Sequence, residues 1–281
     1  MDAATWLGLE GTGTPLRWRL PVSAGVCSGY RQLFGGAGLA AGLVALEQAT
    51  GRRTVWATAQ YLRYAAEGTS LDLEVTIPVT GHRISQGRVV ARSGDDEILT
   101  VTGAFGDRPT DEVHTLASFP RVPPPGDCPV RGGPGAGHNL GGRLEVRLAG
   151  GRHLSDLDGT PGDGRVCLWV RVTGALEASA AWLAVIGDLV PSGVAAARGV
   201  MGGGNSLDNT LRVLRLVPSP WILCDIGIDG LARGFAHGWG HLWSEDGVLM
   251  ATASQSVIVR SHVDRRPPPE RAEHPTGDAA C

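Results

Sequence analysis

The sequence contains no lysine, so all 25 of its basic side chains are arginines. A catalytic Schiff base needs a lysine amine, and the phosphate-binding loop of P-loop nucleotide hydrolases also contains a lysine. Both kinds of site are therefore excluded. The basic residues are balanced by 28 acidic ones, which leaves a net charge of −3. This balance gives no electrostatic reason to expect a nucleic-acid partner.

Cysteine and long apolar runs are scarce as well. The five cysteines are odd in number and form no Cys-x-x-Cys pair, which argues against a disulfide framework. The first residues, MDAATWLGLEGTG, lack the basic and apolar regions of a secretory signal. No apolar run approaches the ~20 residues of a membrane span, and Ala279–Cys281 is not a peroxisomal address. We therefore expect a cytoplasmic protein without a membrane span.

What the sequence does contain is an internal repeat. Of its 281 residues 42% are hydrophobic, which is enough for a sizeable core. In the first half, a helix from Phe34 to Thr50 precedes four predicted strands, at about residues 54–64, 71–80, 83–93 and 97–106. In the second half, a helix from Glu177 to about Leu189 precedes four more, at about residues 206–217, 221–229, 232–243 and 247–260. The two sets superpose with an offset near 150 residues, which indicates a duplicated structural unit.

Each unit also needs one strand before its helix. Leu16–Leu20 and Arg143–Leu148 are short candidates, and Arg165–Val172 is a stronger one. Between the halves, a segment rich in proline and glycine has no sustained periodicity, which is typical of a linker. The last residues contain too few apolar side chains to order themselves. The predicted domains are residues 1–106, 107–142 (the linker), 143–260 and 261–281 (a disordered tail).

Small residues in the first helix predict close packing. Leu39, Leu43 and Leu46 form one face, and glycine and alanine fill most of the rest. Each glycine inside a helix costs up to about 1 kcal/mol relative to alanine, so we expect other backbone to approach this helix closely. In the strand Arg233–Trp243, bulky side chains alternate with glycine and alanine, as expected where a sheet curls over a neighbour. The pattern predicts an antiparallel sheet wrapped around a helix.

Three motifs suggest cofactor, covalent or metal chemistry, and their context argues against each. Gly36–Ala41 matches the Gly-x-Gly-x-x-Ala dinucleotide fingerprint, but no buried parallel strand precedes it. Ser206 lacks the second glycine of a serine-hydrolase elbow and precedes a strand. His237 and His241 would lie ~13 Å apart on a strand, too far for one metal ion. We expect no cofactor and no metal.

Two polar residues interrupt apolar patterns. Alternation in Val248–Val259 places Gln255 in a row of otherwise apolar side chains. An amide buried without a partner costs about 1–3 kcal/mol, so this side chain needs a polar neighbour. Asp188 ends the apolar run Trp182–Gly187, either near a helix end or pointing into a cleft. A glutamine satisfied by backbone groups and an aspartate on a solvated helix end remain alternatives to a functional site.

The order and spacing of several short motifs resemble the acyl-CoA thioesterase II family, whose members carry two hotdog units in one chain. The resemblance covers about residues 28–106 and 143–260. The motifs are Arg31–Gly36 (Arg-Gln-Leu-Phe-Gly-Gly), Gly187-Asp188-Leu189, Ser206-Leu207-Asp208-Asn209, Asp246-Gly247-Val248-Leu249, Ser254-Gln255 and Val259-Arg260. The resemblance implies an α+β double hotdog with two strand-helix-four-strand repeats, each a curved antiparallel sheet wrapped around a helix.

The resemblance also implies three catalytic residues. In such enzymes an aspartate, a threonine or serine, and a glutamine hold the nucleophilic water, and here these are Asp188, Ser206 and Gln255. Asp188 would act as general base, while the hydroxyl and the amide would orient the water. The family usually has threonine where this chain has Ser206. A histidine common in the family aligns with Ala59, so no histidine receives a catalytic role.

Substrate-binding groups follow from the same resemblance. Backbone N–H groups at Gly35 and Gly36, where the first helix begins, are candidates for binding the oxyanion, and so are those at Gly204 and Asn205. Close packing explains the first two glycines about as well. The apolar faces between helix and sheet would house the acyl chain, and surface arginines would contact the CoA phosphates.

The implied activity is hydrolysis of an acyl-CoA thioester to a free acid and CoA, within lipid or fatty acid metabolism. One alternative is a hotdog hydratase or dehydratase, which would need a histidine five residues after the aspartate; Gly193 occupies that position after Asp188. Another is a non-catalytic protein that binds acyl thioesters, which would be expected to lack the three polar residues. The resemblance further implies association into homodimers or tetramers.

Overall fold

The strands of the protein form one large antiparallel sheet. The computed structural model describes residues 1–110, 112–131, 137–172 and 178–261. The strands of the first half are β1 (Glu10–Gly11), β2 (Arg17–Pro21), β3 (Thr54–Tyr61), β4 (Ser70–Thr80), β5 (Ile84–Ser93) and β6 (Asp96–Gly106). Those of the second half are β7 (Leu144–Gly150), β8 (Arg165–Val172), β9 (Gly202–Ser206), β10 (Asp208–Val213), β11 (Ile222–Ala232), β12 (Phe235–Ser244) and β13 (Leu249–Ser261). Their order in the sheet is β1-β2-β4-β5-β6-β3-β10-β13-β12-β11-β8-β7, and β9 also pairs with β13.

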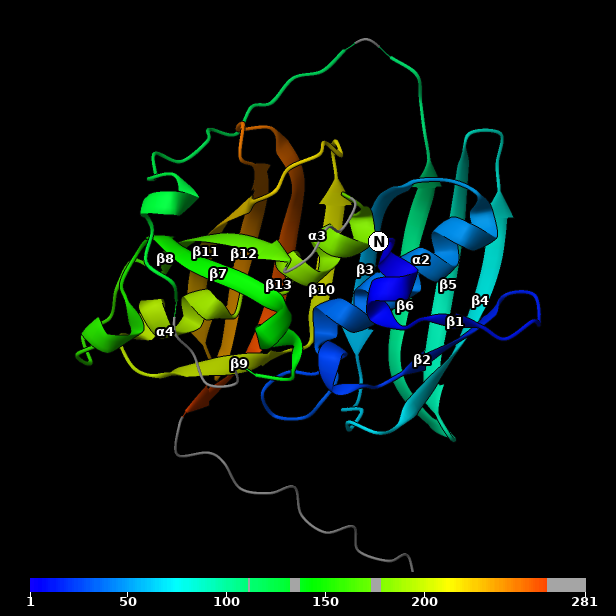
Figure 1. Ribbon diagram of the computed structural model, residues 1–281, viewed down its shortest axis with the longest axis horizontal. Helices are drawn as coiled ribbons and strands as arrows, with labels where there is room; N and C mark the ends of the chain where they lie inside the picture. The colour runs from blue at the N-terminus through cyan, green and yellow to red at the C-terminus, as the bar shows by residue number, and fades with distance from the viewer. Residues whose placement is uncertain (111, 132–136, 173–177, 262–281) are drawn as a thin grey trace, which may run out of the picture.

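Helices lie against this sheet (Figure 1). The α-helices are α1 (Ala3–Leu7), α2 (Gly35–Thr50), α3 (Ala180–Gly187) and α4 (Ser192–Arg198), and the short 3-10 helices are η1 (Ala24–Val26), η2 (Pro125–Asp127), η3 (Leu140–Arg143) and η4 (Leu154–Asp156). The helix predicted from Glu177 to about Leu189 is therefore α3, which is shorter than expected, and a separate helix, α4, follows it. The expected first residue of α3, Glu177, lies outside the described residues.

The predicted repeat is confirmed by the order of the strands. In the first half β2 lies beside β4, and in the second half β8 lies beside β11, so in each half a strand from before the helix joins four strands from after it; β1, β7 and β9 are additional to this repeat. The stronger candidate, Arg165–Val172, is the equivalent of β2, while β7 is an additional strand outside β8. The two halves join where β3 pairs with β10. The boundaries of the four predicted domains stay predictions, and residues 262–281 of the tail lie outside the described residues.

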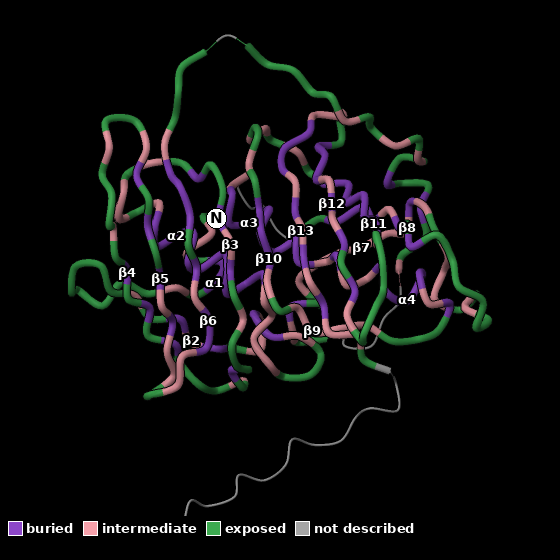
Figure 2. The backbone as a smooth tube through the Cα atoms, turned by 180° about the vertical axis from the view of Figure 1, so that it is seen from behind, coloured by how far each residue is buried: buried purple, intermediate pink, exposed green. Residues whose placement is uncertain are grey.

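The helix α2 is enclosed by the sheet, as its small residues predict. Every residue from Gly36 to Leu46 is buried (Figure 2). A Cβ atom on Gly38 would lie 2.6 Å from the Leu99 side chain, and one on Gly42 would lie 2.7 Å from that of Val101. Both neighbours project from β6, so the glycines let the sheet approach the helix more closely than any larger residue would allow.

The start of α2 packs against the C-terminal half of α3. A Cβ atom on Gly36, in the first turn of α2, would lie 2.8 Å from the backbone oxygen of Ala184 in α3. At the C-terminal end of α3, a Cβ atom on Gly187 would lie 3.2 Å from that of Ala253 on β13. These contacts bring the start of α2, the end of α3 and the middle of β13 to one place.

The sheet curls equally closely over the second half. A Cβ atom on Gly238 would lie 3.0 Å from Val190, and one on Gly240 would lie 3.5 Å from the same side chain. Val190 is buried in the turn between α3 and α4. The bare face predicted for Arg233–Trp243 is thus the face that β12 turns toward the helices.

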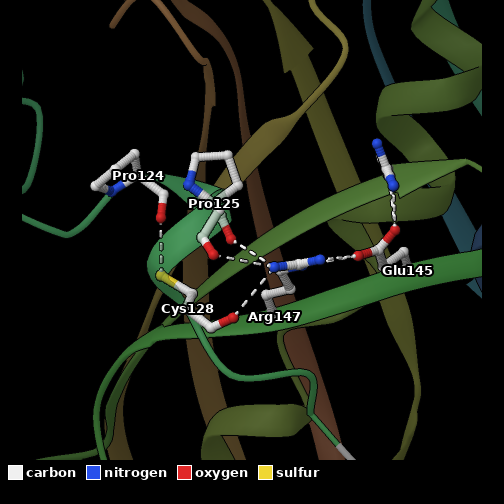
Figure 3. A network of polar contacts seen from close by, with 7 residues as sticks. Pro124, Pro125, Cys128, Glu145 and Arg147 are labelled. Carbon is white, nitrogen blue, oxygen red and sulfur yellow. Dashed lines mark hydrogen bonds and ion pairs between the residues drawn. The ribbon is translucent and has the colours of Figure 1, made fainter.

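Part of the predicted linker packs on the second half (Figure 3). The guanidinium of Arg147 on β7 donates to the backbone oxygens of Pro125, at 3.0 Å, and Cys128, at 3.4 Å. The same side chain pairs with Glu145 at 2.7 Å, so its charge is compensated. The indole of Trp169 donates to the backbone oxygen of Pro123 at 2.9 Å. These bonds fix residues 123–128 to β7 and β8.

One stretch of the described residues has the length and composition of a membrane-spanning helix. It runs through Ala180–Arg198, and its mean hydropathy is 1.5. However, 78% of the window is buried inside the protein. The stretch comprises α3 and α4, which are core helices interrupted by a turn.

Candidate active site

The predicted aspartate lies in the interior, at the end of α3. Asp188 is the residue directly after this helix and is only 5% exposed. Its side chain is buried because α3 packs against α2 on one side and against β13 on the other. The alternative of an aspartate on a solvated helix end is therefore wrong, and a buried carboxylate needs hydrogen-bond donors.

Three groups donate hydrogen bonds to this carboxylate. The backbone N–H of Gly36 donates to Asp188 Oδ2 at 2.7 Å. Ser206 Oγ donates to Asp188 Oδ1 at 3.3 Å, and Gln255 Nε2 donates to the same oxygen in a very short contact. The structure thus brings the three residues Asp188, Ser206 and Gln255 together, although they are far apart in the sequence.

Two neighbouring strands supply the serine and the glutamine. Ser206 ends β9 and lies opposite Val257 of β13, and Gln255 precedes Val257 by two positions. Because side chains two apart on a strand share a face, Gln255 and Ser206 project toward the same side of the sheet. Gln255 is 3% exposed, as its place in an apolar row predicts, and its polar neighbour is Asp188.

The environment makes Asp188 a much weaker acid than usual. Burial raises its pKa from 3.8 to about 7 because the charged form is deprived of water. The hydrogen bonds from Gly36, Gln255 and Ser206 oppose this effect, since they stabilise the charged form. A carboxylate whose pKa is close to neutral pH is suited to act as a general base.

The glycines that begin α2 lie directly at this carboxylate. Gly36 uses its N–H on Asp188, so one of the predicted oxyanion donors is already occupied. A Cβ atom on Gly35 would lie 2.9 Å from Asp188 Oδ2 and 2.8 Å from the ring of Tyr61. Neither glycine leaves room for a larger side chain.

The other two predicted oxyanion residues have different surroundings. Gly204 lies opposite Val259 in the ladder between β9 and β13. Asn205 accepts a hydrogen bond from Arg260 Nε at 3.0 Å. Within the described part of the chain, neither Gly204 nor Asn205 makes a hydrogen bond to Asp188. The structure therefore groups Gly35 and Gly36, rather than this pair, with the carboxylate.

Two further polar residues belong to the same region and were missed by the sequence analysis. Asn209 on β10 is fully buried, and the hydroxyl of Tyr61, the last residue of β3, is buried too. Asn209 alternates with Leu211 and Val213, so it is a polar residue in an apolar row, the signal that identified Gln255. No such pattern distinguishes Tyr61. The described residues contain no group of three or more His, Cys, Asp and Glu side chains that could hold a metal ion.

Comparisons with known proteins agree with this architecture. Residues 23–106 match the family model of the acyl-CoA thioesterase N-terminal domain, and residues 122–259 match that of the C-terminal domain. None of the curated proteins matches the chain.

Solved structures give the same result. A protein from Novosphingobium aromaticivorans assigned as a thioesterase is 30% identical, with a TM-score of 0.80, over 90% of this chain and 98% of its own. A hotdog-fold protein from Alicyclobacillus acidocaldarius is 22% identical, with a TM-score of 0.81, over 93% and 98% of the two chains. The acyl-CoA thioesterase II TesB2 of Mycobacterium marinum is 20% identical, with a TM-score of 0.72, over 92% and 98%. The α+β double hotdog fold is thereby confirmed, and the chain belongs to the acyl-CoA thioesterase family.

Proposed function

We propose that the protein hydrolyses acyl-CoA thioesters to a free acid and CoA, with Asp188 as the general base. The observation that carries this proposal is the buried carboxylate whose pKa lies at about 7, next to a hydroxyl and an amide. Membership of the acyl-CoA thioesterase family and the thioesterase names of its structural relatives support it.

The hydrogen-bond polarity around Asp188 favours a water molecule as the nucleophile. Gln255 and Ser206 both donate to Asp188, so they present acceptor atoms, Gln255 Oε1 and the lone pairs of Ser206 Oγ, to a ligand. A water molecule that donates one proton to Asp188 and the other to one of these acceptors keeps a lone pair free. That lone pair would point at the thioester carbon, and the fixed orientation would lower the entropic cost of attack.

The reaction would then proceed through a tetrahedral intermediate. The water oxygen bonds to the thioester carbon while Asp188 takes a water proton, and the carbonyl electron pair moves to its oxygen. Collapse breaks the carbon–sulfur bond, and the sulfur of CoA leaves with the electron pair and takes the proton from Asp188, which regenerates the carboxylate. Since Gly36 already donates to Asp188, the N–H of Gly35 is the helix-start group that we expect to face the oxyanion.

The remaining details of the proposal come from the family resemblance. The apolar faces between helix and sheet would take the acyl chain, arginines would contact CoA, and copies of the chain would associate into dimers or tetramers in the cytoplasm. The replacement of the usual threonine by Ser206 keeps the hydroxyl that contacts Asp188.

A thiol-release assay tests the proposal. Short, medium and long acyl-CoAs are incubated with the wild-type protein and with Asp188→Asn, and free CoA is measured with a thiol-reactive dye. Asp225→Asn is the matched control, because Asp225 is equally buried but pairs with Arg165 away from the site. Thiol release by the wild type and the control, but not by Asp188→Asn, is the expected result.

Other outcomes would favour the alternatives. Tight binding of acyl-CoA without thiol release at any chain length would support a non-catalytic binding protein. A change in enoyl absorbance without thiol release would support a hydratase. Full activity of Asp188→Asn would remove the proposed base.

A further inference from the structure

Four buried polar atoms near the site have no hydrogen-bond partner within the described residues. They are Tyr61 Oη, both amide atoms of Asn209, and Gln255 Oε1. Buried polar atoms without a partner are rare in proteins, and each loses the hydrogen bonds that water would have given it. Their concentration beside a candidate active site suggests that a ligand supplies the missing partners.

The strand pairing between the two halves brings Tyr61 and Asn209 together. Asn209 lies opposite Ala59 on β3, and the N–H of Tyr61 donates to the backbone oxygen of Leu207 at 2.9 Å. Tyr61 is two positions after Ala59, so the two side chains share a face and are diagonal neighbours across the ladder, within reach of each other. One comes from each half of the duplicated fold.

The hydroxyl of Tyr61 also lies close to the catalytic carboxylate. The position of a Cβ atom on Gly35 would be 3.0 Å from Tyr61 Oη and 2.9 Å from Asp188 Oδ2. Both oxygens therefore lie beside the first residue of α2, at the same end of the site. A substrate carbonyl next to Asp188 would lie beside this hydroxyl.

An inventory of donors shows what these groups could do. The N–H of Gly36, the O–H of Ser206 and one N–H of Gln255 are used on Asp188, whereas the O–H of Tyr61 and the Nδ2 group of Asn209 make no hydrogen bond within the described residues. Burial and the nearby charge of Asp188 raise the pKa of Tyr61 well above its ordinary value, although the adjacent side chain of Asn209 opposes the shift, so the hydroxyl keeps its proton at neutral pH.

We propose that Tyr61 and Asn209 are further catalytic residues, which donate hydrogen bonds to the thioester carbonyl oxygen and stabilise the oxyanion that forms from it. This inference rests on the proposed thioesterase function. Donors that are fixed in a buried site before the reaction stabilise the developing charge more than they stabilise the neutral carbonyl. Asp188 and Gln255 Oε1 would accept the protons of the water, and Tyr61 and Asn209 would face the oxygen of the substrate.

Kinetics of Tyr61→Phe and Asn209→Leu provide the first test. Each substitution keeps the approximate size of the side chain and removes the donor. We expect kcat for acyl-CoA hydrolysis to fall about 10²-fold or more in each variant, with little change in KM. Tyr64→Phe is the matched control, because this tyrosine is 57% exposed, and its kcat should stay at the wild-type value.

The pH profile separates direct contact from an effect through Asp188. Removal of a group that stabilises the oxyanion lowers the rate at every pH and leaves the acid limb of the profile, which Asp188 sets, at the same pH. A group that only positions Asp188 would displace that limb when removed. If Tyr61→Phe and Asn209→Leu displaced the acid limb far enough to account for their lost activity, the assignment of these residues to the oxyanion would be overturned.

A second measurement does not depend on turnover. Acyl-CoA labelled with ¹³C at the carbonyl is bound to Asp188→Asn, and its carbonyl band is recorded by difference infrared spectroscopy. The band should move to lower frequency on binding, and the shift should shrink when Tyr61→Phe is added. Two results would overturn this inference while leaving Asp188 as the base. One is a carbonyl band at the same frequency in Asp188→Asn with and without Tyr61→Phe. The other is wild-type kcat in both Tyr61→Phe and Asn209→Leu. Absence of thiol release from wild-type protein, by contrast, contradicts the proposed function, and the band still decides whether Tyr61 contacts the carbonyl.

Discussion

Replacing Asp188 with asparagine should remove most of the activity and, above neutral pH, stabilise the fold. The pKa of this carboxyl is raised from 3.8 to about 7, chiefly by burial. One pKa unit corresponds to about 1.4 kcal/mol, so relative to low pH, where Asp188 is protonated in both states, this residue lowers the free energy of unfolding by about 4 kcal/mol at pH 8 and by about 2 kcal/mol at pH 5. Because the folded state binds this proton more tightly than the unfolded state, the contribution of Asp188 to stability falls from about pH 4 to about pH 7 and is constant above it.

Asparagine keeps the shape of the side chain but changes one acceptor into a donor. Gln255 Oε1 has no partner, so rotation of the Gln255 amide lets it accept from the new amide. A poorly matched hydrogen bond would still cost about 1–3 kcal/mol. We therefore expect Asp188→Asn to be more stable than the wild type by about 1–3 kcal/mol at pH 8, and to have nearly equal stability at pH 5.

Urea unfolding at pH 5 and pH 8 measures this difference, and thiol release measures activity in the same samples. Loss of the general base should lower kcat by about 10²- to 10⁴-fold. In the wild type, kcat/KM should rise with pH and level off above about 7, where Asp188 is ionised. Asp225→Asn should keep its activity and lose stability at both pH values, because it weakens the bond with Arg165. A variant of Asp188 that is destabilised more at pH 8 than at pH 5 would refute the reasoning.

Three other substitutions test the surroundings of Asp188. Ser206→Ala should lower kcat about tenfold, since a hydrogen bond of about 1.5 kcal/mol is lost, and should move the acid limb of the profile to higher pH. Gln255→Ala should act in the same direction and more strongly, which steady-state kinetics from pH 5 to 9 would show; a limb that moves to lower pH would contradict both expectations. Gly36→Ala would place a Cβ atom 2.8 Å from a backbone oxygen of α3, and should destabilise the protein by about 1–3 kcal/mol. Thermal unfolding measures this loss against Gly203→Ala, where no atom lies within 4 Å of the added Cβ and no change is expected; equal melting temperatures would refute close packing at Gly36.

Local sequence patterns predicted most of the fold because they depend on short-range periodicity. The strands β3 to β6 and β10 to β13 lie within a few residues of their predicted limits. The second helix differs because Asp188 and the residues after it form a tight turn, in which Leu189 N–H donates to Ile186 at 3.0 Å. This turn ends α3 at Gly187 and starts α4, although the composition of the whole stretch is suited to one helix.

Part of the site was also predictable. Gln255 interrupts an apolar row and Asp188 ends an apolar helix, and each observation calls for a buried polar partner. Neither pattern identified the partner, because Gln255 and Asp188 are 67 residues apart in the chain. The family resemblance supplied that link, and the structure supplied the contact itself.

The sequence by itself determined the duplicated unit, the small-residue helix that a sheet could enclose, and the polar residues that face inward. Only the tertiary structure decided which inward-facing groups meet. The pairing of β3 with β10 places Tyr61 beside Asn209, and the packing of α2 on α3 places the Gly36 N–H on Asp188. Both depend on how the two halves fit together, and a shift of one residue in that register would turn Tyr61 and Asn209 to opposite faces. Such long-range register is set by the packing of whole elements, so it leaves no periodic signal in the chain.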